Sequence, residues 1–295
     1  MLNGRVVWAM LWDAKAPQSG PFMTDDNQDP DRPREGFKPH TARFRTPRVI
    51  GALLLREMTT TFGRSSLGYL WAVIEPVGYI IVLTLAFSII FKQPPVGTSF
   101  PLFYATGFLP FSIYNSCQSK ISVAIAQNKT LLFYPAVTYT DVIIARFLLV
   151  ALTDSVVALL VFGGLLVYAQ VPYLPDIPLV MSGLALALMF GGAVGLVNAT
   201  LFEIFPAWKS LWKIVTRPMF FISCVFYLFD ALPNTVRDVL WWNPLVHAIG
   251  LIRAGFYPEY EAAYVSPLYV VGVSLVLMTF GLINLRTSNK FIINN

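Results

Sequence analysis

Charge is scarce in this sequence of 295 residues. Only 13% of the residues are charged, against about 25% in an average soluble domain, and 56% are hydrophobic. Residues 1–64 contain 10 of the 21 Lys and Arg residues and 7 of the 16 Asp and Glu residues. What remains is too little charge to cover the surface of a soluble domain. The chain from about residue 65 onward is therefore expected to be an integral membrane protein.

Cysteine and histidine are scarce as well. Cys117 and Cys224 both lie in apolar stretches, which disfavours a disulfide framework and favours buried free thiols. His40 and His247 are too few to form a metal cluster. We predict no catalytic residues and no metal site.

Nucleotide-binding signals are also missing. A phosphate-binding loop of the P-loop type needs a Gly-Lys dipeptide, and the sequence contains none. The predicted cytoplasmic loops also lack an Asp-x-Asp pair of the kind that holds a metal–sugar-nucleotide. No cofactor is expected in this chain. If it works in ATP-driven transport, a separate ATPase must bind the ATP and Mg²⁺.

The sequence does contain long apolar runs. A helical span needs roughly 20 mostly apolar residues. Such runs predict an all-α, polytopic membrane protein with six transmembrane helices in a permease domain over residues 64–295. The predicted spans are about 67–91, 100–126, 137–168, 177–202, 212–229 and 262–285.

The segment 230–261 is the ambiguous part of this assignment. The run Leu240-Trp241-Trp242-Asn243-Pro244 interrupts it, and tryptophan prefers the membrane interface. We therefore predict a re-entrant outer hairpin before the last span. The alternative is a seventh span, which would place Arg286 and Lys290 on the outer side.

The positions of Lys and Arg predict the orientation. With the N-terminus inside, six spans place 18 Lys and Arg residues on the inner side and 3 on the outer side. This asymmetry follows the positive-inside rule and predicts cytoplasmic N- and C-termini. Residues 1–45 are rich in Pro, Asp and Arg and are expected to form a disordered cytoplasmic tail.

Residues 46–63 are predicted to form an amphipathic interface helix. Thr46-Pro47 provides an N-cap and a proline at the first helical position, and Ile50, Leu54 and Met58 recur every fourth residue. Glu57 falls on the apolar side of this helix. In a structural role, Glu57 forms an ion pair with a nearby arginine or snorkels to water. In a functional role, it contacts a partner or acts as a hinge to the first span. The sequence favours neither role.

Two further polar features lie in or near the spans. Residues 126–135 form a short polar-then-apolar segment ended by Pro135, which suits either a plain turn or a small helix that a cytoplasmic protein binds. Asp154 lies near the middle of a span, where an acid points to a proton relay or to a structural bond. We favour the structural bond, to a Ser or Thr of a neighbouring helix or to Arg146.

Three separate motifs resemble those of a known family. Leu55-Arg56-Glu57-Met58, followed by Phe62-Gly63-Arg64 through Ala72 and Glu75-Pro76, resembles the opening signature of ABC-type polysaccharide exporters. Leu131 to Pro135, with Asp141 and Ala145-Arg146, resembles their segment after the second span. Asn243 to His247, with Ile252 to Phe256, resembles the outer hairpin of the capsule-export branch. The similarity covers roughly residues 46–295.

This resemblance implies a function. The chain would be the permease of an ATP-driven exporter that moves lipid-linked capsular polysaccharide from cytoplasm to periplasm across the bacterial inner membrane. It would act as a homodimer with two copies of an ABC ATPase, a periplasmic adaptor of the polysaccharide co-polymerase type and an outer-membrane channel, without nucleic acid. Export of O-antigen or teichoic acid is the alternative within the family.

The resemblance and the local chemistry together suggest three groups of site residues. Contact with the ATPase would involve Glu57, Gln127, Asn128, Lys129, Leu131 and Phe133. Arg56 and Arg64 would receive an anionic lipid phosphate at the entrance, although anchoring at the inner membrane surface explains each of them as well. The aromatic side chains Tyr69, Trp71, Tyr79, Phe220, Phe226 and Tyr227 would line the conduit, although an interfacial belt explains each of them as well.

Two other function classes stay open from the residues. A membrane-embedded glycosyltransferase or prenyltransferase would need the acidic clusters that the sequence lacks. A proton-coupled carrier would have Asp154 as its only support.

Overall fold

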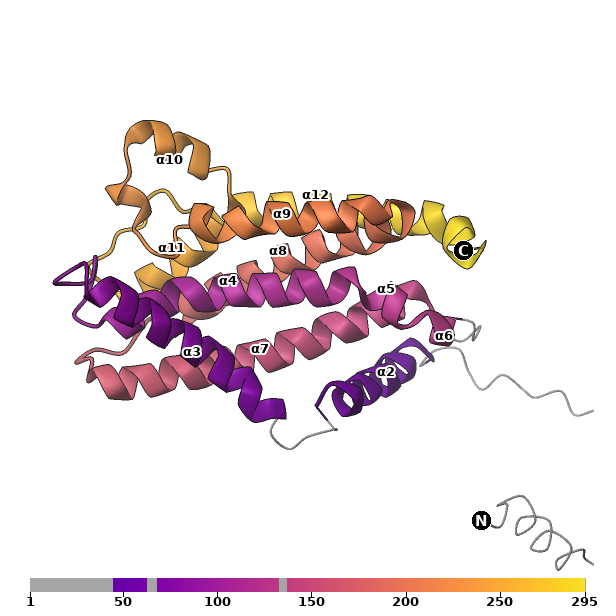
Figure 1. The fold of residues 1–295 in the computed structure, drawn as a ribbon, viewed down its shortest axis with the longest axis horizontal. Coiled ribbons are helices and arrows are strands. Elements are labelled where there is room, and N and C mark those ends of the chain that lie inside the picture. The colour runs from indigo at the N-terminus through magenta and orange to yellow at the C-terminus, as the bar shows by residue number, and fades with distance from the viewer. Residues whose placement is uncertain (1–44, 63–67, 133–136, 295) are drawn as a thin grey trace, which may run out of the picture. The chain divides into compact units, whose positions relative to one another are not determined.

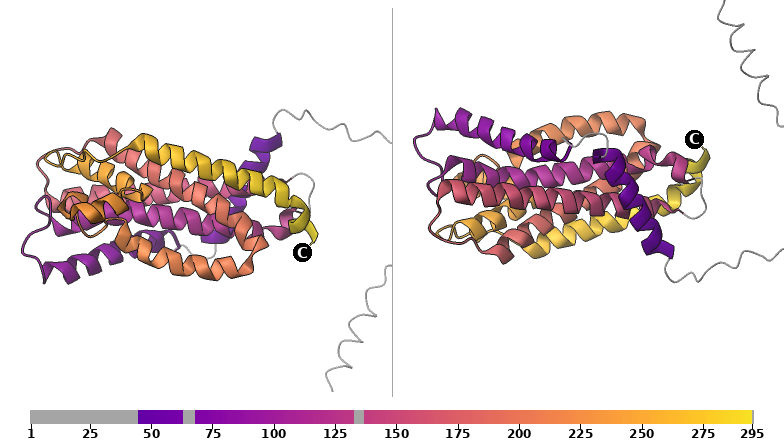
Figure 2. Two further views of the ribbon diagram at one scale, coloured as in Figure 1. Left: turned by 90° about the horizontal axis from the view of Figure 1, so that it is seen from above. Right: turned by 90° about the horizontal axis from the view of Figure 1, so that it is seen from below.

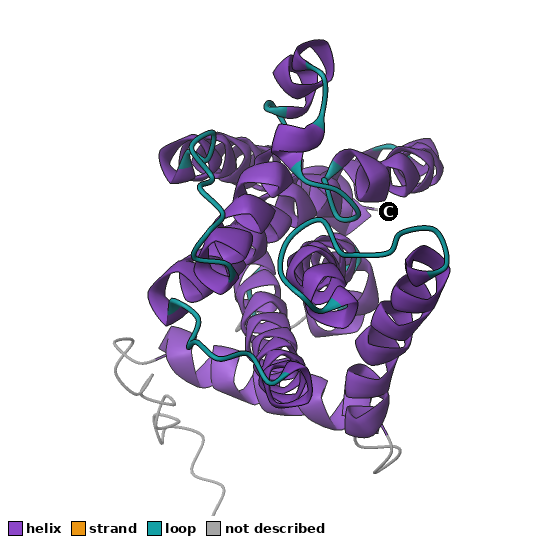
Figure 3. Ribbon diagram, turned by 90° about the vertical axis from the view of Figure 1, so that its left-hand side faces the viewer, coloured by secondary structure: helices purple, strands orange, loops and turns teal. Residues whose placement is uncertain are grey.

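The computed structural model describes residues 45–62, 68–132 and 137–294, all within the compact unit Phe44–Asn295. Residues 1–44 of the predicted tail, Arg64 and Phe133 lie outside these residues, and so does the side chain of Tyr69. Arg45, the last residue of the predicted tail, begins a helix. The described residues form helices and connecting loops, without a strand, as Figure 3 shows. The all-helical class is confirmed for this part of the chain.

Four helices are long and apolar enough to cross a membrane. Each contains an 18-residue window of high mean hydropathy with at most two charged residues. They are α3 (Gly68–Ser88), α7 (Tyr139–Ala169), α8 (Ile177–Ile204) and α12 (Pro267–Asn294).

Two further helices occupy the remaining predicted spans but do not meet this standard. Helix α4 (Phe100–Ser122) carries a row of polar residues, and α9 (Pro206–Ile222) has 17 residues and three cations. The structure thus supports a multi-pass membrane protein with four candidate spans. Six spans remain a prediction.

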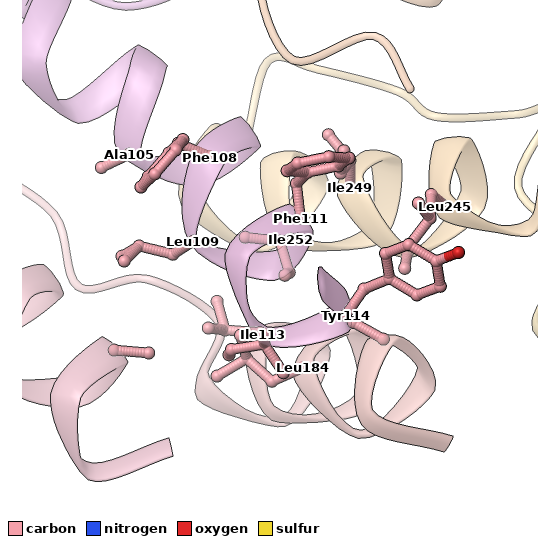
Figure 4. Packing of buried hydrophobic residues seen from close by; sticks show 14 of the residues in the cluster. Ala105, Phe108, Leu109, Phe111, Ile113, Tyr114, Leu184, Leu245, Ile249 and Ile252 are labelled. Carbon is pink, nitrogen blue, oxygen red and sulfur yellow. The ribbon is translucent and has the colours of Figure 1, made fainter. Parts of the chain in front are cut away.

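Helices α4 and α8 form the centre of the bundle (Figure 1). Side chains of α4, α8 and α11 (Pro244–Phe256) meet in the largest apolar cluster, part of which Figure 4 shows. Two glycines of α8 allow the close approach: a Cβ at Gly191 would lie 2.9 Å from the Tyr114 carbonyl oxygen, and one at Gly195 would lie 2.8 Å from the Ile121 Cβ. Small residues bring two backbones together where apolar lipid gives helices little other reason to associate.

The two ends of the bundle carry different short elements. One end carries α5 (Ala124–Gln127), α6 (Lys129–Leu132) and α2 (Arg45–Phe62), which crosses the bundle obliquely (Figure 2). The other end carries the single turn η3 (Phe229–Ala231), α10 (Asn234–Leu240) and α11.

Helix α11 has 13 residues and is almost wholly buried. Its length is about 20 Å, too short to cross a hydrocarbon core of about 30 Å. A non-spanning segment here is consistent with the predicted outer hairpin, but its depth in the membrane and its re-entrant character remain predictions.

Candidate functional site

Five polar side chains join three elements at the α2 end of the bundle. A Glu57 carboxylate oxygen lies 3.0 Å from Nη2 of Arg146 on α7, and it accepts a hydrogen bond of 3.3 Å from the Asn128 amide. Arg146 also donates to Oε1 of Gln127 at 2.6 Å, and Arg56 donates to Oδ1 of Asn128 at 3.0 Å. We refer to these five residues as the α2 polar cluster.

The charged centre of the α2 polar cluster is buried, whereas Arg56 and Gln127 are exposed. Glu57, Asn128 and Arg146 are each at most 9% exposed. Beside them, Leu53 of α2 packs against Ala124 and other apolar side chains of α5 and α7. For Glu57 the structure shows the ion-pair alternative. Because breaking a buried pair leaves an uncompensated charge, this contact holds α2 on α5 and α7.

The predicted ATPase-contacting segment has a buried side and an exposed side. Asn128 faces inward, whereas Gln127 and Lys129 are exposed and Leu131 is half-buried. Lys129 forms an ion pair with Glu203 of α8, 3.4 Å away. The exposed residues of this segment are those that a partner protein can touch.

The structure brings part of the predicted aromatic conduit together. Tyr79 of α3 stacks on Phe108 of α4, with ring centroids 5.1 Å apart. Phe220 of α9 contacts the rings of Phe108 and Phe111, and Phe226 lies 4.7 Å from Phe220. Tyr79 and Phe220 also line one cavity of about 240 Å³. Aromatic rings of α3 and α9 are thereby joined through α4.

Two of the predicted conduit residues lie elsewhere. Trp71 is 65% exposed and is absent from the lining of the cavities around α4. Tyr227 lies in the turn after α9, where its hydroxyl donates to the Phe221 carbonyl oxygen at 2.7 Å.

A polar row on α4 was not among the predicted site residues. Ser112, Asn115, Ser116 and Ser119 follow the spacing i, i+3, i+4, i+7, which places them on one helix face. Three cavities of about 510, 290 and 240 Å³ open along this face, and Asn115 lines all three. The spacing is visible in the sequence and is the signal that would have found this face.

Asp154 reaches the same polar face from α7. It lies 3.7 Å from Nζ of Lys120, and both side chains line the 290 Å³ cavity together with Glu75 of α3. Arg146, suggested above as a partner, is engaged with Glu57 instead. Eight residues of helix separate the two backbone positions by about 12 Å, and each side chain has its own partner, Glu57 for Arg146 and Lys120 for Asp154.

Two buried side chains of the opposite end, Arg253 and His247, bind backbone groups rather than carboxylates. Arg253 of α11 is 1% exposed and donates to the carbonyl oxygens of Tyr227 at 2.7 Å and Val225 at 2.9 Å. The ring of His247 accepts at Nδ1 from the Ser266 amide, so the proton is on Nε2, which lies 2.8 Å from the Trp241 carbonyl oxygen. Burial lowers the pKa of His247 and keeps the ring neutral.

Within the described residues, no group of three or more His, Cys, Asp or Glu side chains lies close enough to hold a metal ion. Cys117 and Cys224 are both buried free thiols.

Comparison with known proteins gives consistent matches. The family described as "ABC-2 type transporter" matches residues 48–257. The polysialic acid transport protein KpsM of Escherichia coli is 34% identical over 245 residues, covering 82% of this chain and 94% of that protein.

Two capsule export inner-membrane proteins are similar as well. CtrC of Neisseria meningitidis serogroup A is 27% identical over 80% of this chain and 89% of that protein. BexB of Haemophilus influenzae is 25% identical over 82% of this chain and 92% of that protein.

Proposed function

The chain belongs to the ABC-2 type transporter family, and on that premise we propose that it is the membrane permease of an ATP-driven capsular polysaccharide exporter. The observation that carries this proposal is the similarity to KpsM, which extends over most of both chains. CtrC and BexB, whose names describe capsule polysaccharide export, support the same substrate class. The proposed cargo is a lipid-linked polysaccharide moved from the cytoplasm to the periplasm.

The permease would act as a homodimer, with the conduit between α3 and α9 of two copies. Helix α9 buries none of its residues in the single chain, and α3 exposes Trp71, Tyr79 and Leu85 by more than half. An apolar face of a membrane helix is covered by lipid or by another helix, and we assign these two aromatic faces to the second copy. The aromatic contacts of Tyr79 and Phe220 and the polar face of α4 would then border the path.

The ATPase would be a separate subunit in two copies, with ATP and Mg²⁺ bound there. The exposed side of the segment Gln127–Leu132, with Gln127 and Lys129, would meet it. The α2 polar cluster supports this assignment, because it links that segment to α2 and α7 through buried and part-buried hydrogen bonds and an ion pair. A push on α5 and α6 would therefore be transmitted to both helices.

Further partners would continue the path in a Gram-negative envelope. We propose a periplasmic adaptor and an outer-membrane channel, a six-span topology with both termini in the cytoplasm, and an outer hairpin that shapes the exit. Export of O-antigen or teichoic acid is the second candidate within the family.

Purification of the tagged chain from its native membrane in mild detergent tests the proposal. A soluble nucleotide-binding protein at one-to-one stoichiometry, identified by mass spectrometry, is the expected result. Loss of capsule staining in a deletion strain, restored by the plasmid-borne chain, would then identify the cargo. Failure to recover an ATPase in several gentle detergents would contradict the exporter assignment, and intact capsule in the deletion strain would favour the second candidate.

A further inference from the structure

A cavity with a partly polar lining lies between α4 and α9. It has a volume of about 510 Å³ and is lined by Lys209, Lys213 and Arg217 of α9. These cations follow the spacing i, i+4, i+8, which places them on one helix face. Within the described part of the chain, none of them lies within ion-pair distance of a carboxylate. The cavity is therefore a positively charged site without an internal counter-ion.

The depth of these cations separates them from ordinary anchoring residues. Anchoring cations gather near the ends of spans. Lys209 lies close to the start of α9, but Arg217 lies eleven residues beyond Pro206, about 17 Å along the helix axis. In the proposed six-span topology α9 is embedded in the membrane, where a cation this far along the helix is costly unless it faces a polar cavity or a partner. Arg217 faces such a cavity.

The rest of the lining provides neutral polar groups and an aromatic face. The indole N–H of Trp212 donates to Oε1 of Gln118 at 2.9 Å, and the Gln118 amide donates to Oδ1 of Asn115 at 3.2 Å. These bonds fix the Trp212 ring against the polar face of α4. Asn115 and Ser119 offer hydrogen-bonding groups beside it. An aromatic plane next to amides and hydroxyls is suited to a sugar ring.

Charge repulsion supports the need for an occupant. Like charges four residues apart on a helix repel each other and destabilise it. An oxyanion in the cavity would remove this repulsion and would gain charge-assisted hydrogen bonds, bidentate ones from Arg217. Arg56, predicted above to receive a phosphate, already donates to Asn128. The cavity on α9 is thus the better placed of the two anion sites.

We propose that the cavity between α4 and α9 binds an oxyanion group of the exported glycolipid through Lys209, Lys213 and Arg217, with Trp212 against an adjoining sugar ring. The oxyanion is either the carboxylate of an acidic sugar or the phosphate of the lipid anchor. This inference rests on the proposed export function and names a binding site for its cargo.

Equilibrium binding to the purified full-length chain in nanodiscs of neutral lipid tests the inference. The probes are a fluorescent oligogalacturonate, which carries carboxylates without a lipid, and fluorescent lyso-phosphatidylglycerol, which carries a phosphate without a polymer. A maltooligosaccharide of equal length is the neutral probe. We expect the double variant Lys213→Gln/Arg217→Gln to bind at least one anionic probe at least tenfold more weakly, because it removes two cations and the loss of one charge-assisted contact alone weakens binding about tenfold.

Two matched variants control for charge and folding. Lys213→Arg/Arg217→Lys keeps both charges and should retain the affinity, and Arg237→Gln removes a cation from α10, outside the cavity. All variants should elute as single species of parental size. Weaker binding of the oligogalacturonate alone assigns the acidic sugar, and weaker binding of the lysophospholipid alone assigns the phosphate.

Three results would overturn the inference. They are unchanged binding of both anionic probes, an equal loss for the maltooligosaccharide, and an equal loss in Arg237→Gln. Because this assay contains no ATPase, failure to co-purify an ATPase would count against the proposed function without altering the binding result. Conversely, a chain that co-purifies with an ATPase but binds both probes independently of Lys213 and Arg217 would retain the function and lose the site.

Discussion

A buried arginine stabilises each end of the bundle, but the two arginines bind different kinds of group. At the α2 end, Arg146 binds side chains, the Glu57 carboxylate and the Gln127 amide. At the α11 end, Arg253 binds two backbone carbonyls and lies 4.6 Å over the Phe103 ring. The two side chains that Arg146 binds belong to separate elements, α2 and α5, which can move apart. The two carbonyl groups that Arg253 binds belong to one turn. The comparison identifies α2 as the element whose attachment can change and α11 as a fixed support.

Removing the Arg253 cation should have the largest effect. In Arg253→Met the carbonyl groups of Val225 and Tyr227 lose two charge-assisted hydrogen bonds within a buried site. We expect a loss of about 3–6 kcal/mol in stability, at about 1.5–3 kcal/mol for each bond. Thermal unfolding in detergent measures this loss, and the whole α11 end should unfold together with the core.

Arg237→Met is the matched control on the same end. The Arg237 side chain donates to Asn234 within one helix, so its loss should change stability by no more than about 0.5 kcal/mol. An Arg253→Met variant as stable as Arg237→Met would show that the α11 end does not depend on this cation.

Removing the Glu57 charge should have the next largest effect. In Glu57→Gln the Arg146 cation stays buried without its carboxylate, which should cost about 3 kcal/mol. Unlike the loss at Arg253, this loss should be local. Hydrogen exchange should become faster in α2 before it does so in α8.

Two further variants sharpen this test of the α2 polar cluster. Adding Arg146→Gln to Glu57→Gln should restore part of the protection, because no unpaired charge remains. Glu203→Gln breaks an ion pair whose Lys129 side chain is 46% exposed, and it should cost no more than about 1 kcal/mol. Equal hydrogen-exchange protection of α2 in the parent and in Glu57→Gln would contradict the difference inferred between the two ends.

Acid should weaken the α11 end by a smaller amount. Burial lowers the pKa of His247 from the usual 6.5, so below about pH 6.5 the unfolded chain gains a proton that the folded chain does not. Stability from this residue is therefore full above pH 6.5 and falls as the pH falls, by at most about 1.4 kcal/mol per pH unit. Unfolding temperatures measured on both sides of pH 6.5 should differ less in His247→Gln than in the parent.

The helical class and the approximate helix positions follow from apolar runs, because a membrane forces such runs into helices. The partners of buried charges do not follow from them. Arg146 was weighed as a partner of Asp154, since both lie on one apolar run, but the fold brings Glu57 to it from a helix far away in sequence. Contacts of this kind depend on how α2 crosses α7, which helix periodicity does not encode.

The sequence likewise predicts some residues of the candidate site and not others. Aromatic composition suggested Tyr79 and Phe220, and both line one cavity. The polar row of α4 has helical spacing in the sequence, but it is a weak signal because single serines are common in apolar helices. Helix α4, with this polar row, and helix α9, with its cations, are the two that fall short of a clear apolar window. Apolar runs alone therefore do not decide whether these two predicted spans cross the membrane.

Neutralising Asp154 should have the smallest effect of these changes. Its partner Lys120 is 40% exposed to the cavity, so the ion pair is screened and should contribute no more than about 1 kcal/mol. If the chain is an ATP-driven exporter, Asp154→Asn should therefore keep capsule export within about twofold of the parent, because ATP hydrolysis and not proton transfer drives the step. Export is measured as surface polysaccharide in a deletion strain that carries the variant, with Lys120→Gln as the matched control. If Asp154→Asn abolishes export while Lys120→Gln preserves it, the carboxyl group itself is required. The carrier mechanism would then explain the residue better than the structural role assigned to it.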